Sequence, residues 1–168
     1  MLVAILLMRV LLEILFLQTW VLFILVTVIN AYIFKSRSQK YIATNPELEE
    51  GYKKMFKGLL YYGNVPWIII GIGNLAGLTN STFEYLAPRQ LNPIVLVFHL
   101  AVIVLWVLSL KWIYFQNGAE FLEQHPGLLR PNQTARQIKI FFSLSILGAV
   151  IAMILMWVKN PSIPKFYF

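Results

Sequence analysis

The chain has 168 residues, of which 59% are hydrophobic and only 12% are charged, and its formal net charge is +7. Soluble domains contain roughly 45–50% apolar residues, so this composition indicates an integral membrane protein. The absence of cysteine excludes disulfides, thiolate metal ligands and cysteine nucleophiles. No basic stripe typical of a nucleic-acid-binding face is visible, so we interpret the positive charge as membrane topology and contact with anionic lipid.

Four apolar segments are long enough to cross a bilayer as helices, which takes about 20 residues. They run over about residues 14–34, 58–78, 93–115 and 140–158. None alternates like a barrel strand, so we predict an all-α integral membrane four-helix bundle that forms a single transmembrane domain over residues 1–168. Ten of the 14 lysines and arginines lie within residues 35–57 and 111–139. The positive-inside rule therefore places both termini and the loop at 80–92 on the outer side.

The first span follows an apolar stretch that contains Arg9 and Glu13, four residues apart. One helix over residues 1–34 would be about 51 Å long, which exceeds the bilayer core. We therefore expect Arg9 and Glu13 to pair at the outer headgroup level. A buried ionic lock against another helix or subunit and a misassigned start codon remain open alternatives. The segment lacks the pattern of a cleaved signal, so we expect the first span to remain as an anchor.

The second span contains an internal proline and several glycines. Pro66 predicts a kink, because its ring removes one backbone hydrogen bond and frees the carbonyl of Tyr62. On a helical wheel one stripe is formed by Gly63, Pro66, Ile70, Asn74 and Gly77. Gly73 and Gly77 also form a small-xxx-small pair, which favours close packing of another helix. A broken helix that forms a transport site is the alternative.

Polar residues within the four spans fall at two depths. Gln18, Asn74 and His99 lie near the outer ends, whereas the inner level consists of Asn30, Asn64, Ser109, Ser143 and Ser145. The residues between these levels are almost wholly apolar. We interpret the two levels as interhelical hydrogen bonds, and we expect that a monomer does not conduct ions.

The two histidines lie near opposite membrane faces, so one subunit cannot offer both to one haem. We expect His99 to be a neutral imidazole bonded to Asn74 or Gln18, with a functional role as the alternative. His125 lies in a loop with Glu120 and Glu123, and these three side chains are candidates for a divalent-cation site. Their spacing matches no known metal motif, and we predict no cofactor.

The other inner loop contains three glutamates followed by three lysines. Asn45–Pro46 reads as a helix start, with the acids in the first turn and the lysines later. We predict an amphipathic interfacial helix that leads into the second span.

Three strings occur in order within about residues 51–130: GNVPW, PRQLNP and GAEFLEQHPG. Together they resemble a group of uncharacterised bacterial multi-pass membrane proteins. The resemblance implies a bacterial inner-membrane location and supplies no activity, so no functional residue is transferred.

No catalytic template fits the available residues, and we predict no catalytic residues and a protein that is not an enzyme. The favoured function is a structural or accessory protein that associates with itself or with a larger membrane complex. The alternative is a small transporter or channel whose pathway forms between subunits.

Overall fold

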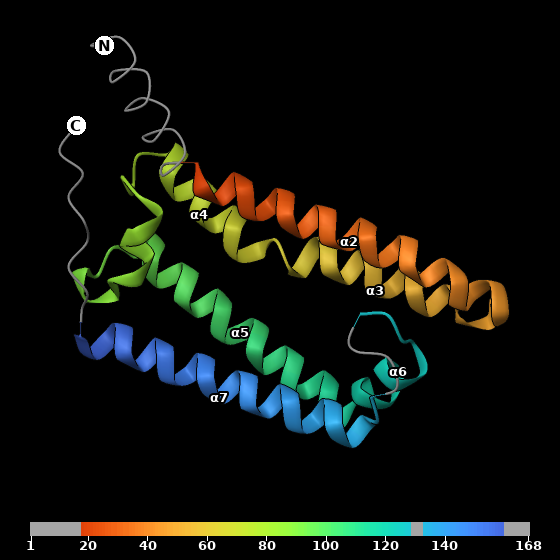
Figure 1. Cartoon of the computed structure of the whole chain (residues 1–168). Helices are drawn as coiled ribbons and strands as arrows, with labels where there is room; N and C mark the ends of the chain where they lie inside the picture. The colour runs from red at the N-terminus through yellow and green to blue at the C-terminus, as the bar shows by residue number, and fades with distance from the viewer. Residues whose placement is uncertain (1–17, 129–132, 160–168) are drawn as a thin grey trace, which may run out of the picture.

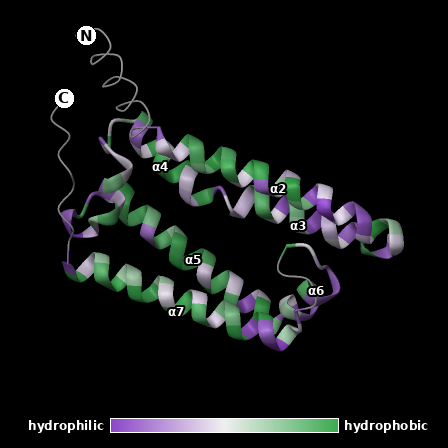
Figure 2. Ribbon diagram, in the orientation of Figure 1, coloured by the Kyte–Doolittle hydropathy of each residue, from purple (hydrophilic) through white to green (hydrophobic). Residues whose placement is uncertain are grey.

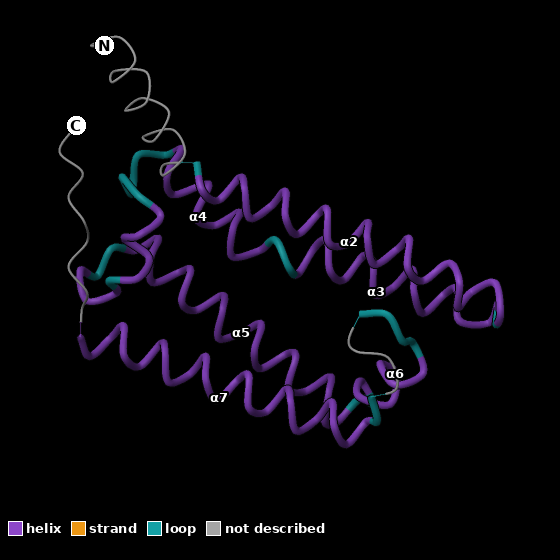
Figure 3. The backbone as a smooth tube through the Cα atoms, in the orientation of Figure 1, coloured by secondary structure: helices purple, strands orange, loops and turns teal. Residues whose placement is uncertain are grey.

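The computed structural model describes residues 18–128 and 133–159, and within these ranges the chain is helical with connecting loops and no strands (Figure 3). The predictions for Arg9 and Glu13 lie outside the described residues. The helices are α2 (Thr19–Thr44), η1 (Pro46–Leu48), α3 (Glu49–Tyr62), α4 (Val65–Leu75), η2 (Thr82–Leu86), η3 (Pro88–Gln90), α5 (Pro93–Phe115), α6 (Gly118–Gln124) and α7 (Ala135–Lys159).

The long helices lie side by side and alternate in direction. α3 and α4 run back along α2, α4 also packs on α5, and α7 lies alongside α5 (Figure 1). One end of the molecule brings together the start of α2, the end of α4, η2, η3, the start of α5 and the end of α7. We call it the η end. The turn from α2 to α3 and the short helix α6 lie at the opposite end, the α6 end.

Three helices in the described part of the chain, α2, α5 and α7, are long and apolar enough to span a membrane, with 26, 23 and 25 residues. The prediction of an all-α fold is therefore confirmed for the described residues. The prediction of long apolar helices is confirmed for three of them, α2, α5 and α7. Figure 2 shows that α5 and α7 are hydrophobic over most of their length, whereas hydrophilic residues gather toward the α6 end. α2 continues ten residues past the predicted limit at Phe34, because its polar second half packs on α3.

The second predicted span is not one kinked helix, and in this respect the sequence prediction is wrong. The chain leaves α3 after Tyr62 and enters α4 at Val65, so the break falls at Gly63–Asn64, before Pro66. Pro66 lies in the first turn of α4, where a missing backbone donor breaks no helical bond. α4 alone, with 11 residues, reaches only about 16 Å. A crossing here needs the apolar part of α3 as well.

Asparagine–proline pairs start two of the helical segments. The side chain of Asn92 accepts a hydrogen bond from the backbone N–H of Ile94 (3.1 Å), and Pro93 is the first residue of α5. Asn45 accepts in the same way from Glu47 (3.2 Å). The predicted start at Asn45–Pro46 thus forms η1, and α3 follows from Glu49 with Glu49–Lys53 and Glu50–Lys54 ion pairs.

Among the described residues, buried side chains form three small clusters rather than one core. Phe34, Tyr52 and Met55 join α2 to α3; Ile70, Tyr85 and Val95 join α4, η2 and α5; Ile113, Ala119 and Ile138 join α5, α6 and α7. Most apolar side chains of α5 and α7 are exposed. In lipid such faces are not driven to pack on each other, so the polar contacts at the two ends matter most for the fold.

Candidate functional site

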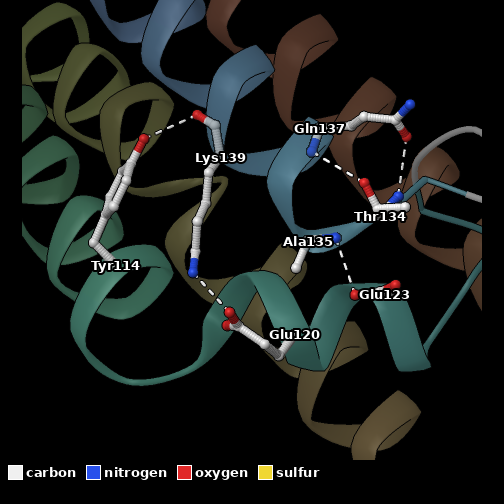
Figure 4. Close-up of polar contacts among 7 residues, drawn as sticks. All are labelled: Tyr114, Glu120, Glu123, Thr134, Ala135, Gln137 and Lys139. Carbon is white, nitrogen blue, oxygen red and sulfur yellow. Dashed lines mark hydrogen bonds and ion pairs between the residues drawn. The ribbon is translucent and has the colours of Figure 1, made fainter.

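The densest polar network lies at the α6 end, where α5, α6 and α7 meet. The ammonium of Lys139 on α7 lies 2.6 Å from a carboxylate oxygen of Glu120 on α6 (Figure 4). One turn further along α6, Glu123 accepts a hydrogen bond from the backbone N–H of Ala135 (3.0 Å). Ala135 is the first residue of α7, so Glu123 satisfies a free donor at the positive end of the helix dipole.

Tyr114 connects α5 to the same turn of α7. Its hydroxyl donates to the backbone carbonyl of Lys139 (2.9 Å) and also bonds to the hydroxyl of Ser143. Figure 4 shows Lys139 between the two: its backbone faces Tyr114 and its ammonium faces Glu120. The hydrogen bond from Lys139 holds the pKa of Glu120 below its ordinary value.

An open groove of about 730 Å³ runs beside this network. It is lined by Tyr114, Glu120, Ala135, Arg136, Lys139, Ile140, Ser143 and Leu144. Arg136 is exposed and has no ion-pair or hydrogen-bond partner among the described residues. The groove therefore offers a basic side chain next to an apolar wall.

Glu120, Glu123 and His125 are not brought together as ligands for one cation. Glu120 pairs with Lys139, Glu123 with the start of α7, and His125 with the backbone of α6. Within residues 18–128 and 133–159 no group of three or more potential metal-ligating side chains occurs. We do not propose the metal site further.

His125 instead belongs to a contact between α3 and α6. Its Nδ1 donates a hydrogen bond to the carbonyl of Phe121 (2.8 Å), and its ring stacks on the Phe121 ring. The His125 ring also meets the Tyr52 ring edge-on, and these two ring centroids lie 5.1 Å apart. The Tyr52 hydroxyl donates to the carbonyl of Pro126 (2.8 Å), and burial raises the pKa of Tyr52 to about 12. A Cβ atom at Gly51 would overlap the His125 imidazole. We call Gly51, Tyr52, His125 and Pro126 the clasp.

At the η end a second buried cluster surrounds Tyr85. His99 donates from Nε2 to the carbonyl of Tyr85 (2.9 Å), so its expected bond to Asn74 or Gln18 is replaced by a backbone partner. Thr79 donates to the side-chain oxygen of Asn74 (2.6 Å) and approaches the Tyr85 hydroxyl at 3.4 Å. Gln18 lies in the turn before α2, and its carbonyl accepts from Val21.

The inner polar level is only partly interhelical. Ser143 bonds to Tyr114 on α5, as described above. By contrast, Asn64 and Ser145 donate to carbonyls four residues earlier in the chain, those of Leu60 and Phe141. Asn30 is exposed on α2, and Ser109 is half-buried on α5.

The glycines of the second span have different roles. A Cβ at Gly63 would lie 3.1 Å from the methyl group of Thr27 on α2, and one at Gly73 would overlap the Tyr85 hydroxyl. Gly77 has a φ of +68° and no neighbour within 4 Å of a Cβ, so it ends α4 as a turn rather than packing on another helix. Gly71 packs under the Trp20 ring, although it is not a member of the predicted stripe.

Sequence reasoning missed the three tyrosines that connect separate elements, Tyr52, Tyr85 and Tyr114. Their hydroxyls donate to backbone carbonyls far away in the chain, those of Pro126, Ile70 and Lys139, and no spacing in the sequence indicates such partners.

Over the residues that the structure describes, the fold and its sites define an all-helical chain with three helices long and apolar enough to cross a membrane. No known family model, curated protein or solved structure matches the chain.

Proposed function

We propose that the protein is a multi-pass protein of the bacterial inner membrane that acts as a structural or accessory component, either as a homo-oligomer or within a larger membrane complex. Four crossings are formed by α2, by α3 and α4 together, by α5 and by α7. Both termini lie outside, and the α6 end faces the cytoplasm. The hydrophilic residues at the α6 end support this orientation (Figure 2).

The observation that carries the proposal is the engagement of polar side chains by the fold itself. His99 and His125 each donate to a backbone carbonyl, and Tyr114 joins α5 to α7. These bonds hold one ring nitrogen of each histidine and the Tyr114 hydroxyl in place, and those of His99 and Tyr114 connect separate elements of the chain. A fold-stabilising role explains them without a reaction.

The outward faces of α5 and α7 support a role in lateral association. Leu100, Val107, Leu147 and Ile154 are examples of their exposed apolar side chains. In a bilayer these faces meet lipid tails or other transmembrane helices, since no other described residue covers them.

A transport pathway between subunits is the second candidate, and the break at Gly63–Asn64 favours it. Broken helices in transporters present backbone groups and side chains to a solute. Here the side-chain oxygen of Asn64 is buried and has no hydrogen-bond partner.

Solvent access distinguishes the two candidates, and the cysteine-free chain makes the test clean. Ile72 is 54% exposed on α4, whereas Leu78 lies exposed in the loop that follows. In reconstituted protein, Ile72→Cys is expected to face lipid or a neighbouring helix and to resist a membrane-impermeant maleimide, while the control Leu78→Cys reacts. Rapid labelling of Ile72→Cys would overturn the structural proposal in favour of a water-filled path.

A further inference from the structure

The groove at the α6 end combines charge and apolar surface in a fixed order along α7. Arg136, Lys139 and Ser143 are three and four residues apart, so they lie on the same side of the helix. Ile140 and Leu144 lie in the same wall, and their side chains are 53% and 63% exposed. The basic residues are therefore nearest the helix start, Ile140 follows Lys139 directly, and Leu144 lies about one turn deeper.

The basic side chains of the groove still have capacity to bind an anion. Arg136 has no ionic partner among the described residues, and its guanidinium offers five N–H donors. Lys139 contacts one oxygen of Glu120, which leaves donors of its ammonium for a second acceptor. Glu120 neutralises one of the two positive charges and fixes Lys139 in place. Arg136 thus supplies the net positive charge of the groove.

The position of the groove relative to the apolar part of α7 indicates the kind of anion. The long apolar run of α7 begins at Ile140, immediately after Lys139. If α7 crosses the bilayer, Arg136 and Lys139 lie at the level of the phosphates, and Ile140 and Leu144 lie at the level of the first acyl carbons. Basic pockets between transmembrane helices on the cytoplasmic side are typical sites for anionic headgroups.

We propose that this groove binds one anionic phospholipid. Arg136 and Lys139 contact the phosphate, and an acyl chain lies along Ile140 and Leu144. The inference rests on the membrane placement of α7 in the proposed function, and it does not depend on the accessory role.

The test uses the full chain in nanodiscs of phosphatidylglycerol and phosphatidylcholine, with retained lipid counted by native mass spectrometry. The wild-type protein is expected to retain phosphatidylglycerol in preference to phosphatidylcholine. Arg136→Gln is expected to weaken this retention about five-fold, the effect of one basic contact at an anionic surface. Arg89→Gln is the matched control, because Arg89 is also exposed but lies at the η end.

Equal retention of both lipids, or an equal loss in Arg136→Gln and Arg89→Gln, would overturn the proposal. Glycerol 3-phosphate is the second probe, and it is expected not to displace the lipid because it lacks the acyl chain. Displacement by it would show a site for soluble phosphate compounds and would also overturn the proposal. Labelling of Lys159→Cys with an impermeant maleimide in intact cells and in inverted membrane vesicles reports the placement of α7 separately, so a failure of lipid binding is distinguishable from a failure of the membrane topology.

Discussion

The hydroxyl of Tyr52 donates a hydrogen bond to the carbonyl of Pro126, 74 positions further along the chain, at 2.8 Å. This bond connects the pair formed by α2 and α3 to the pair formed by α5 and α7 at the α6 end. At the η end, the side chain of Asn92 before α5 donates to the carbonyl of Leu78 after α4 (2.7 Å), and α4 packs on α5. The two pairs of helices are thus joined by specific polar contacts near both ends, with apolar segments between.

Removing the Tyr52 hydroxyl tests the contribution of the clasp. Tyr52→Phe is expected to lower the free energy of unfolding by about 1 kcal/mol, since it deletes one hydrogen bond and leaves the Pro126 carbonyl unpaired. Thermal unfolding in detergent measures the effect. Tyr62→Phe is the control, because Tyr62 is 64% exposed. Equal midpoints for Tyr52→Phe and the wild-type protein would contradict a structural role for the bond.

Gly51 tests the same contact from the opposite side. Gly51→Ala places a methyl group in the space of the His125 imidazole, and overpacking of this kind typically costs about 1–3 kcal/mol. Gly58→Ala on the same helix meets nothing within 4 Å, so it is expected to stabilise by roughly 0.5–1 kcal/mol through helix propensity. The cost of Gly51→Ala should become smaller in a His125→Ala background. An unchanged cost there would show that the two residues are not in contact.

Gly73 on α4 lies against Tyr85, so it offers a parallel test at the η end. A Cβ at Gly73 would overlap the Tyr85 hydroxyl, whereas one at Gly148 on α7 meets nothing. Gly73→Ala is expected to destabilise by about 1–3 kcal/mol and Gly148→Ala to have no such cost. Because Tyr85→Phe removes the overlapping oxygen, the double variant should lose less than the sum of the two single variants. Strict additivity would argue against the observed packing.

The ion pair of Glu120 with Lys139 predicts a dependence of stability on acidic pH. The pKa of Glu120 is lowered in the folded state by the hydrogen bond from Lys139, so the pair stabilises the fold above the ordinary glutamate value, roughly pH 4.3. As the pH falls below that value, Glu120 is protonated in the unfolded state before it is protonated in the folded state. The stabilisation is therefore lost as the pH approaches the lower pKa that Glu120 has in the folded state.

Unfolding midpoints between neutral pH and roughly pH 3 measure this dependence. Glu120→Gln is expected to show a shallower decline than the wild-type protein. Glu47→Gln serves as the control, because Glu47 is exposed and has no ion pair among the described residues. Parallel curves for Glu120→Gln and the wild-type protein would contradict the contribution of the pair.

The long helices were predictable because their signal is local. The apolar run of α5 matches the predicted bounds 93–115, and Asn92 followed by Pro93 marks its start. The break at Gly63–Asn64 was harder to place, because a proline signals only that regular helical bonding stops near it. Whether the helix bends at Pro66 or ends before it depends on what packs nearby, including Thr27 of α2.

The polar contacts were less predictable than the helices. Asn74, His99 and Ser143 were identified as polar residues that matter, yet their partners are Thr79, a backbone carbonyl and Tyr114. Any tyrosine or carbonyl at the same depth satisfies such a group, so depth alone does not choose between them. The candidate cation-binding side chains are not grouped in the described residues for a related reason, since Lys139 and the start of α7 engage the two glutamates.

The second crossing is the central claim of the proposed topology, because α4 is too short to cross the membrane alone. Lys54 on α3 and Asn80 after α4 are both exposed and flank the broken segment. The most direct measurement is labelling of Lys54→Cys and Asn80→Cys with an impermeant maleimide in intact cells and in inverted membrane vesicles. We predict that Asn80→Cys reacts only in intact cells and Lys54→Cys only in inverted vesicles. Reaction of both from the same side would show that α3 and α4 do not cross, and would contradict the account.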